Sequence, residues 1–161
     1  MSGFNAPHET SITLDTETEV RALRLLADEA RRRFADAAVA RLATVRPDGR
    51  PHLVPVTFAA DGDRVYITID AKPKTTVNLR RLRNIATNPQ VALLADHYAA
   101  DWDQLWWARA DGLASVLDQP AGMAAPLRLL AARYPQYRAS PPAGPVISIE
   151  VTRWTGWAAS G

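Results

Sequence analysis

The first strong pattern of hydrophobic positions covers residues 17–34 and has the period of an α-helix. The apolar side chains that recur at this spacing are Val20, Leu23, Ala27, Ala30 and Phe34. Acidic residues come early in the segment and arginines 31–33 come late, which is the order that complements a helix dipole. We therefore expect a first amphipathic helix over residues 17–34.

Three short strands are predicted next, because apolar stretches are separated by tight turns rich in Asp, Gly and Pro. The stretches cover residues 38–45, 51–60 and 64–69, with turns at 46–49 and 61–63. Turns this short join antiparallel strands. Pro51 and Pro55 cannot donate a hydrogen bond to a neighbouring strand, so we expect the second strand at an edge or bend of the sheet.

The second half of the chain predicts two more helices and three more strands. One helix begins at Thr75 or Thr76, buries Leu79, Leu82 and Ile85, and ends before Asn88-Pro89. The other predicted segments are a strand over 90–95, a loop over 96–104, a strand over 105–116 with a kink at Gly112, a helix over 120–134, a loop over 135–145 and a strand over 146–151.

These patterns together predict about six strands and three helices, a mainly β fold with helices. Short strands joined by turns favour a small barrel, because closing a sheet removes its open edges. The 161 residues fit a single domain over 1–161.

Composition narrows the class of protein. The chain is 47% hydrophobic and 22% charged, as in ordinary globular domains, and it has no cysteine, which excludes disulfides and thiolate chemistry. We find neither an apolar run of about 20 residues nor a signal-peptide pattern, so we expect a soluble cytoplasmic protein without a membrane partner. A net charge of +2 argues against binding to nucleic acid.

The basic residues cluster where the third strand passes into the second helix. The cluster consists of Lys72, Lys74, Arg80, Arg81 and Arg83. Free backbone N–H groups and the helix dipole at such a junction favour an anion, so phosphate is the expected ligand, and Asn84 can add an amide hydrogen bond. The alternative is a solvated helix face. The segment lacks the glycines of a Walker loop.

Two segments carry a resemblance to a known family: DAKPKTTVNLRRLRNIATNPQVALLADHY and DWDQLWWARADG. With the order of elements, they resemble the pyridoxamine-phosphate-oxidase-like split β-barrel superfamily, and more narrowly its branch that uses the deazaflavin coenzyme F420 in actinobacteria. The most specific pieces are KPK, LRRLRN, NP and WWARADG. The resemblance covers residues 38–116 and extends to Trp157.

The resemblance implies a homodimer with a flavin-type cofactor in a groove between the subunits. It assigns the cofactor phosphate to Lys72 and Lys74, with Arg81, Arg83 and Asn84 as secondary candidates. It also implies that the strand containing Pro55, Val56 and Thr57 lies along the cofactor ring. The arginine and lysine of the oxidases are absent from that strand, which argues against pyridoxamine-phosphate oxidation.

The tryptophans and the ionisable side chains give weaker signals. Trp107 and Trp157 are candidates to stack on a flat ring, and Arg109, on the same strand face as Trp107, is a candidate partner for phosphate or for a carboxylate across the dimer. The alternative for the tryptophans is packing in the core or the interface. The histidines lack metal-ligand spacing, so no metal is expected, and no catalytic side chain is identified.

The function expected from these observations is hydride transfer between reduced F420 and an apolar conjugated small molecule, because in such enzymes the cofactor supplies the chemistry. Two alternatives stay open at this point. One is an FMN-dependent oxidoreductase. The other is a non-catalytic carrier of flavin, deazaflavin, haem or tetrapyrrole.

Overall fold

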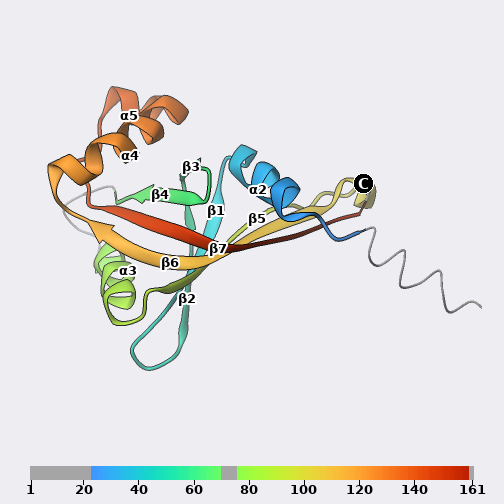
Figure 1. The fold of residues 1–161 in the computed structure, drawn as a ribbon, viewed down its shortest axis with the longest axis horizontal. Helices are drawn as coiled ribbons and strands as arrows, with labels where there is room; N and C mark the ends of the chain where they lie inside the picture. Colours follow the sequence, from blue (N-terminus) through green and yellow to red (C-terminus); the bar gives the residue numbers. More distant parts are fainter. Residues whose placement is uncertain (1–22, 70–75, 160–161) are drawn as a thin grey trace, which may run out of the picture.

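A single antiparallel sheet organises the protein in the computed structural model, which describes residues 23–69 and 76–159 (Figure 1). Its strands are β1 Ala40–Val45, β2 Pro51–Val56, β3 Ala59–Asp61, β4 Arg64–Thr68, β5 Gln90–His97, β6 Trp106–Leu117 and β7 Val146–Ala158. Their spatial order is β2-β1-β5-β6-β7-β4-β3. The described helices are α2 Ala27–Asp36, α3 Thr76–Thr87, α4 Pro120–Arg133 and α5 Pro135–Ala139, with a 3-10 turn at Trp102–Gln104.

The sheet closes on itself because its two edge strands are consecutive in the chain. β2 and β3 lie at opposite ends of the strand order and are joined by Thr57 and Phe58 alone. The expectation that Pro51 and Pro55 lie on an edge strand is confirmed. The predicted strand over 51–60 is instead two strands, since the chain must turn a corner between the two edges.

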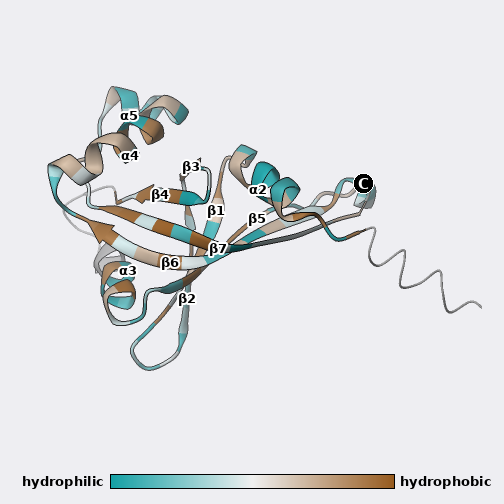
Figure 2. Cartoon of the chain, viewed as in Figure 1, coloured by the Kyte–Doolittle hydropathy of each residue, from teal (hydrophilic) through white to brown (hydrophobic). Residues whose placement is uncertain are grey.

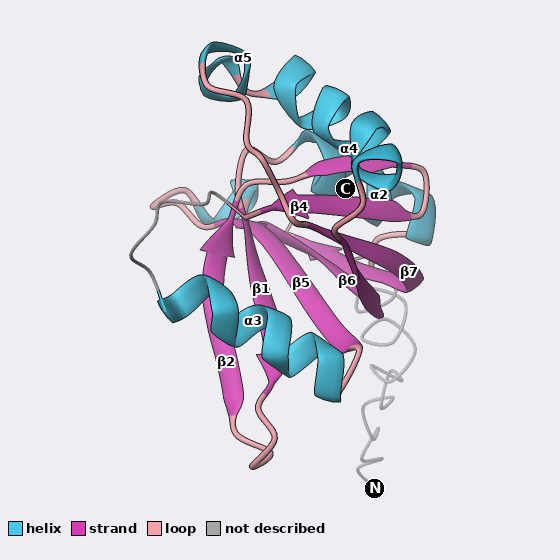
Figure 3. Ribbon diagram, turned by 90° about the vertical axis from the view of Figure 1, so that its left-hand side faces the viewer, coloured by secondary structure: helices cyan, strands magenta, loops and turns pink. Residues whose placement is uncertain are grey.

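Three helices cover the barrel in different places. Contacts join α2 to β6 and β7, α3 to β1 and β6, and α4 to β3 and β4. Figure 3 shows α3 crossing one end of the sheet, away from α2 and α4. None of the helices in the described ranges has the length and apolar character needed to cross a membrane.

The first helix is shorter than its hydrophobic period predicts. It begins at Ala27, and within the predicted segment residues 17–22 lie outside the described part. Leu25 N–H donates to the Gly156 carbonyl over 3.1 Å, and Ala158 N–H donates to the Leu23 carbonyl over 3.1 Å. The backbone before Ala27 therefore pairs with β7, which overrides the helical pattern.

Two predictions for the C-terminal part also needed correction. The expected loop over 135–145 contains α5, which Pro135 starts at its first position. The last strand continues past Val151 to Ala158, because β6 provides pairing partners over that whole length. The predicted ends of α3 and α4 agree with the structure within one residue.

The core lies inside the barrel and under α2. Figure 2 shows hydrophobic residues interrupted by hydrophilic ones along β7, and the first four residues of this strand are all buried. Phe34 of α2 is fully buried, with its ring centroid 4.7 Å from that of Phe58 and 5.3 Å from that of Trp154. Phe58 thus fixes the corner between β2 and β3 from the inside.

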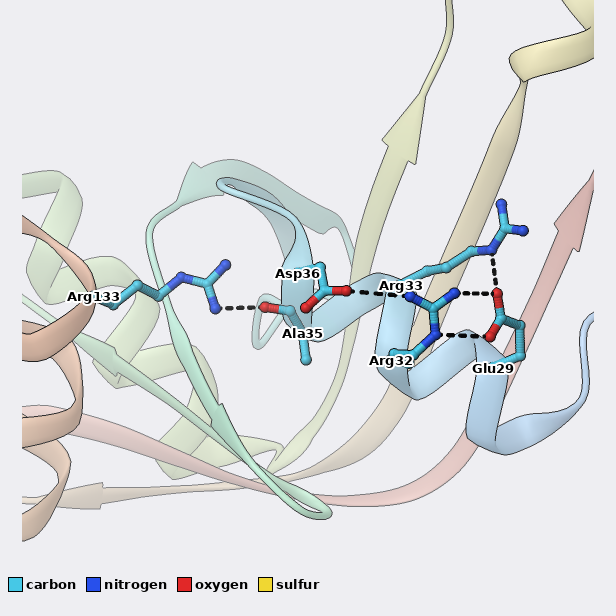
Figure 4. A network of polar contacts seen from close by, with 6 residues as sticks. All are labelled: Glu29, Arg32, Arg33, Ala35, Asp36 and Arg133. Atoms are coloured by element: carbon cyan, nitrogen blue, oxygen red, sulfur yellow. Dashed lines mark hydrogen bonds and ion pairs between the residues drawn. The ribbon is translucent and has the colours of Figure 1, made fainter.

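Polar contacts tie α2 and α4 together on the outside of that corner (Figure 4). Arg133 of α4 donates to the carbonyls of Ala35 and Ala37 at the end of α2. Within α2, the hydrogen bonds from Arg32 and Arg33 lower the pKa of Glu29 to about 2. The two hydrogen bonds of Arg133 join α4 to the end of α2, just before β1.

Gly112 allows a close approach of the β6 and β7 backbones. The pairing of β6 with β7 shifts between Asp111 and Gly112, so the predicted kink is a bulge. A Cβ on Gly112 would lie 2.4 Å from the Glu150 carbonyl oxygen. The residue has to be glycine because the partner there is backbone.

We expect Gly112→Ala to lower the free energy of unfolding by about 1–3 kcal/mol, because the β6–β7 ladder must separate locally. Gly122→Ala in α4 is the control, since its Cβ would meet nothing within 4 Å, and it should be neutral or stabilising. Denaturant unfolding of both variants measures this. Equal stability of the two variants would contradict the close approach.

Candidate functional site

The residues predicted to bind a cofactor lie in three regions of the molecule. Lys72 and Lys74 lie outside the described residues. Arg81, Arg83 and Asn84 are on α3, Pro55 and Val56 end β2, and Thr57 follows β2. Trp107 and Arg109 are on β6.

The outer face of the sheet, away from the core, holds a cavity of about 440 Å³ on β5 and β6. It is lined by Ala92, Leu93, Leu94, Asp96, Tyr98, Trp107 and Arg109. Trp107 lies opposite Asp96 on β5 and opposite Trp157 on β7. The structure therefore brings Trp107 and Arg109 into one cavity and places the indole of Trp157 on the neighbouring strand.

The charged groups at this cavity already have partners within the chain. Arg109 pairs with Asp111, with 3.1 Å between its Nη2 and the Oδ2 of the carboxylate, and Arg41 pairs with Asp96. The floor between these pairs is apolar. Such a surface suits a flat, largely apolar ring better than a phosphate.

Around the outer cavity, large apolar side chains face solvent. Leu53 of β2 is 65% exposed, Leu94 of β5 is 37% exposed, and Leu113 of β6 is also exposed. They lie on strands that are neighbours in the order β2-β1-β5-β6. An apolar surface of this kind is typical of a contact with another molecule.

The corner after β2 is held by two tyrosines, Tyr134 between α4 and α5 and Tyr137 within α5. The Thr57 Oγ1 and the Tyr137 hydroxyl are 2.8 Å apart, and Phe58 N–H donates to the Tyr134 hydroxyl over 3.1 Å. The Tyr134 hydroxyl also lies 3.0 Å from the Ala38 carbonyl oxygen. Thr57 is thus fixed in place, and its contact with a cofactor stays a prediction.

On α3, Asn84 faces the interior. It is 1% exposed, and its Nδ2 donates to the Thr44 Oγ1 of β1 over 2.9 Å. This bond anchors α3 to the sheet, so the structure gives Asn84 a packing role, and its predicted contact with phosphate stays untested. Arg83 is exposed, and burial lowers the pKa of Arg81, whose side chain is half-buried.

His52 is the residue in this region that the sequence did not indicate as functional. It lies opposite Thr44, is 9% exposed, and its Nδ1 has no hydrogen-bond partner among the described residues. Burial lowers the pKa of His52, and the charges of Arg46, Arg80 and Arg81 lower it further. The only signal in the sequence was the place of His52 in a predicted strand, where alternate side chains face the core.

Three buried polar atoms on β2, on β4 and just after β1 lack partners in the described part of the chain. They are the Nδ1 of His52, the Nε of Arg46 and the Oγ1 of Thr68. Thr68 ends β4, immediately before the segment that contains Lys72 and Lys74. Unpaired buried polar groups are costly, so the pair formed by Arg46 and His52 fits a ligand with several hydrogen-bonding oxygens, as a phosphate-bearing cofactor has.

Comparison with known sequences gives two matches of different extent. The model of the family described as pyridoxamine 5'-phosphate oxidase matches residues 26–158. The chain is also 43% identical over 56 residues to a 5a,11a-dehydrotetracycline/5a,11a-dehydrooxytetracycline reductase of Streptomyces rimosus. That alignment covers 35% of this chain and 38% of the length of the reductase.

Solved structures with the same fold include a conserved hypothetical protein from Mycobacterium tuberculosis and an F420 reductase. The first has a TM-score of 0.69 at 19% identity, covering 86% of this chain and 88% of the other. The F420 reductase has a TM-score of 0.56 at 27% identity, covering 74% of this chain and 90% of the other.

The state of His52 predicts a pH dependence of stability. Its pKa in the folded protein is below the ordinary value of 6.5, so the unfolded chain takes up the proton first. The stabilisation from neutral His52 is complete above pH 6.5 and is lost as the pH falls towards the folded pKa. We expect the free energy of unfolding to decrease in this window, and to decrease less steeply in His52→Gln.

Denaturant unfolding at a series of pH values measures this difference in slope. His97→Gln is the matched control, because its side chain is exposed at the end of β5, and it should keep the wild-type slope. A slope in His52→Gln equal to that of the wild type would show that His52 does not titrate during unfolding.

Proposed function

Because the chain belongs to the pyridoxamine 5'-phosphate oxidase family, we propose that it is an oxidoreductase that uses a deazaflavin of the F420 type. The fold of this family binds flavin-type cofactors. The observation that carries the choice of cofactor is the likeness to an F420 reductase, at 27% identity over 90% of that chain. FMN is the second candidate cofactor.

The substrate in this proposal is an apolar conjugated small molecule. The Streptomyces rimosus relative is named as a reductase of dehydrotetracyclines, which contain fused conjugated rings, although the match covers only 38% of its length. The cavity beside Trp107 and Leu94 has an apolar floor suited to a flat molecule. A conjugated acceptor of hydride fits that surface.

When bound, the deazaflavin would supply the hydride chemistry, and the protein would supply position and surroundings. Lys72 and Lys74 would hold the phosphate of the cofactor, and Pro55 and Val56 at the end of β2, with Thr57 after them, would lie along its ring. The bond between Thr57 and Tyr137 limits movement of that strand end. Apolar side chains on the outer face would exclude water from the reacting atoms.

The proposal includes a homodimer with the cofactor between its subunits. The support for it is the row of exposed apolar side chains on β2, β5 and β6, which a second copy would cover. Trp107, Arg109 and Trp157 would then lie in the interface. Removal of this surface from water would stabilise the dimer in proportion to its apolar area.

We expect Lys74→Ala to weaken F420 binding about tenfold or more, because a charged hydrogen bond to phosphate is lost. Arg128→Ala, an exposed cation on α4, is the control and should bind as the wild type does. Equilibrium titration with F420 and FMN in parallel measures both the effect and the preference between cofactors. Unchanged affinity in Lys74→Ala would contradict the phosphate assignment.

A second readout needs no substitution, because Lys72 and Lys74 are the only lysines in the sequence. Bound cofactor should protect both from an amine-reactive reagent, as measured by peptide mass spectrometry. Turnover of reduced F420 with a conjugated acceptor then separates an enzyme from a carrier, since a carrier binds the cofactor and transfers no hydride.

A further inference from the structure

Three arginines meet at the junction of α3 with the hairpin formed by β1 and β2. Arg46 follows β1 in that hairpin, and Arg80 and Arg81 are neighbours on α3. All three lie close enough to His52 for their charges to lower its pKa. Helix and hairpin are held together at this point by the bond between Asn84 and Thr44.

One acidic residue of the described chain lies within electrostatic reach of Arg46. Asp48, in the turn of the hairpin, is the carboxylate whose pKa the charge of Arg46 helps to lower. Its oxygens are occupied by Arg50, whose backbone N–H donates over 3.0 Å and whose Nε donates over 2.9 Å. Asp48 is therefore engaged by Arg50 rather than by Arg46.

Unpartnered polar atoms point to a ligand at the same place. The Nε of Arg46 and the Nδ1 of His52 are buried without a hydrogen-bond partner in the described part of the chain. His52 is more than nine-tenths buried. Leaving buried polar atoms unpaired costs free energy, and gathering like charges costs more, so an anion would relieve both costs.

We propose that Arg46, His52 and Arg80 form a binding site for a phosphate group where α3 meets the β1–β2 hairpin. Guanidinium groups donate several N–H bonds in a plane, the geometry that phosphate oxygens accept. His52 adds an imidazole that becomes a double donor when it is protonated. The site uses none of the residues that the family resemblance assigns to the cofactor phosphate.

The charges at the site give a direct spectroscopic test with inorganic phosphate as the probe. A bound phosphate would offset the fields of Arg46, Arg80 and Arg81, so the pKa of His52 should rise by about one unit or more. NMR titration of the imidazole resonances measures this, and His52→Gln assigns the signal among the three histidines. Identical titration of His52 with and without phosphate would overturn the proposal.

Phosphate affinity in variants of Arg46 and Arg80 tests whether these arginines form the site. Arg80→Gln should weaken phosphate binding about tenfold, because one charged contact with the phosphate is lost. Arg80 is exposed, so this substitution should leave the fold intact. Arg46→Gln should weaken phosphate binding by the same factor, and Arg128→Gln on α4 should bind phosphate as the wild type does. Wild-type phosphate binding by Arg80→Gln would also overturn the proposal.

The source of the phosphate is decided by repeating the titration with F420. A rise in the pKa of His52 with F420, and competition with free phosphate, would assign the site to the phosphate of the cofactor. A response to free phosphate that persists with F420 bound would assign it to a separate ligand. If F420 binds without changing the pKa of His52, and free phosphate does not change it either, the proposed function is retained and the phosphate site proposed here is wrong.

Discussion

The structure depends on one constraint, the closure of the sheet at Thr57 and Phe58. Two residues carry the chain from the edge strand β2 to the edge strand β3, so the corner must be held from both sides. On the core side of the corner, the Phe58 ring packs on Phe34. On the opposite side, the Tyr134 hydroxyl accepts a hydrogen bond from the Phe58 N–H. Because β2 ends at this corner, the same contacts fix the strand that is proposed to lie along the cofactor ring.

Closure also separates the surfaces on which function is proposed. The inner face of the barrel is filled by core side chains, and the two proposed ligand surfaces are the outer face of β5 and β6 and the junction of α3 with the β1–β2 hairpin. The first is apolar, with its ions paired, and the second is basic, with unpartnered polar atoms. A molecule with a flat ring and an anionic tail needs both kinds of surface.

The sequence predicted those structural features that depend on a single residue type and its neighbours in the chain. The missing N–H groups of Pro51 and Pro55 indicated an edge strand, and Gly112 indicated the bulge. Contacts between distant residues could not be predicted, such as the bond of Tyr134 to Phe58, 76 positions away. The basic helix pattern likewise gave no sign that Asn84 turns inward to Thr44, or that His52 is buried beside it.

The central claim is that two copies of the chain form one cofactor site on the outer face, and Leu94→Arg tests it most directly. Leu129→Arg on α4 is the matched control, because both leucines are 37% exposed. Analytical ultracentrifugation with F420 titration should find a dimer that binds F420 in the wild type and the control. It should find a monomer with lost affinity in Leu94→Arg. A monomeric Leu94→Arg that binds F420 as tightly as the wild type would contradict the account.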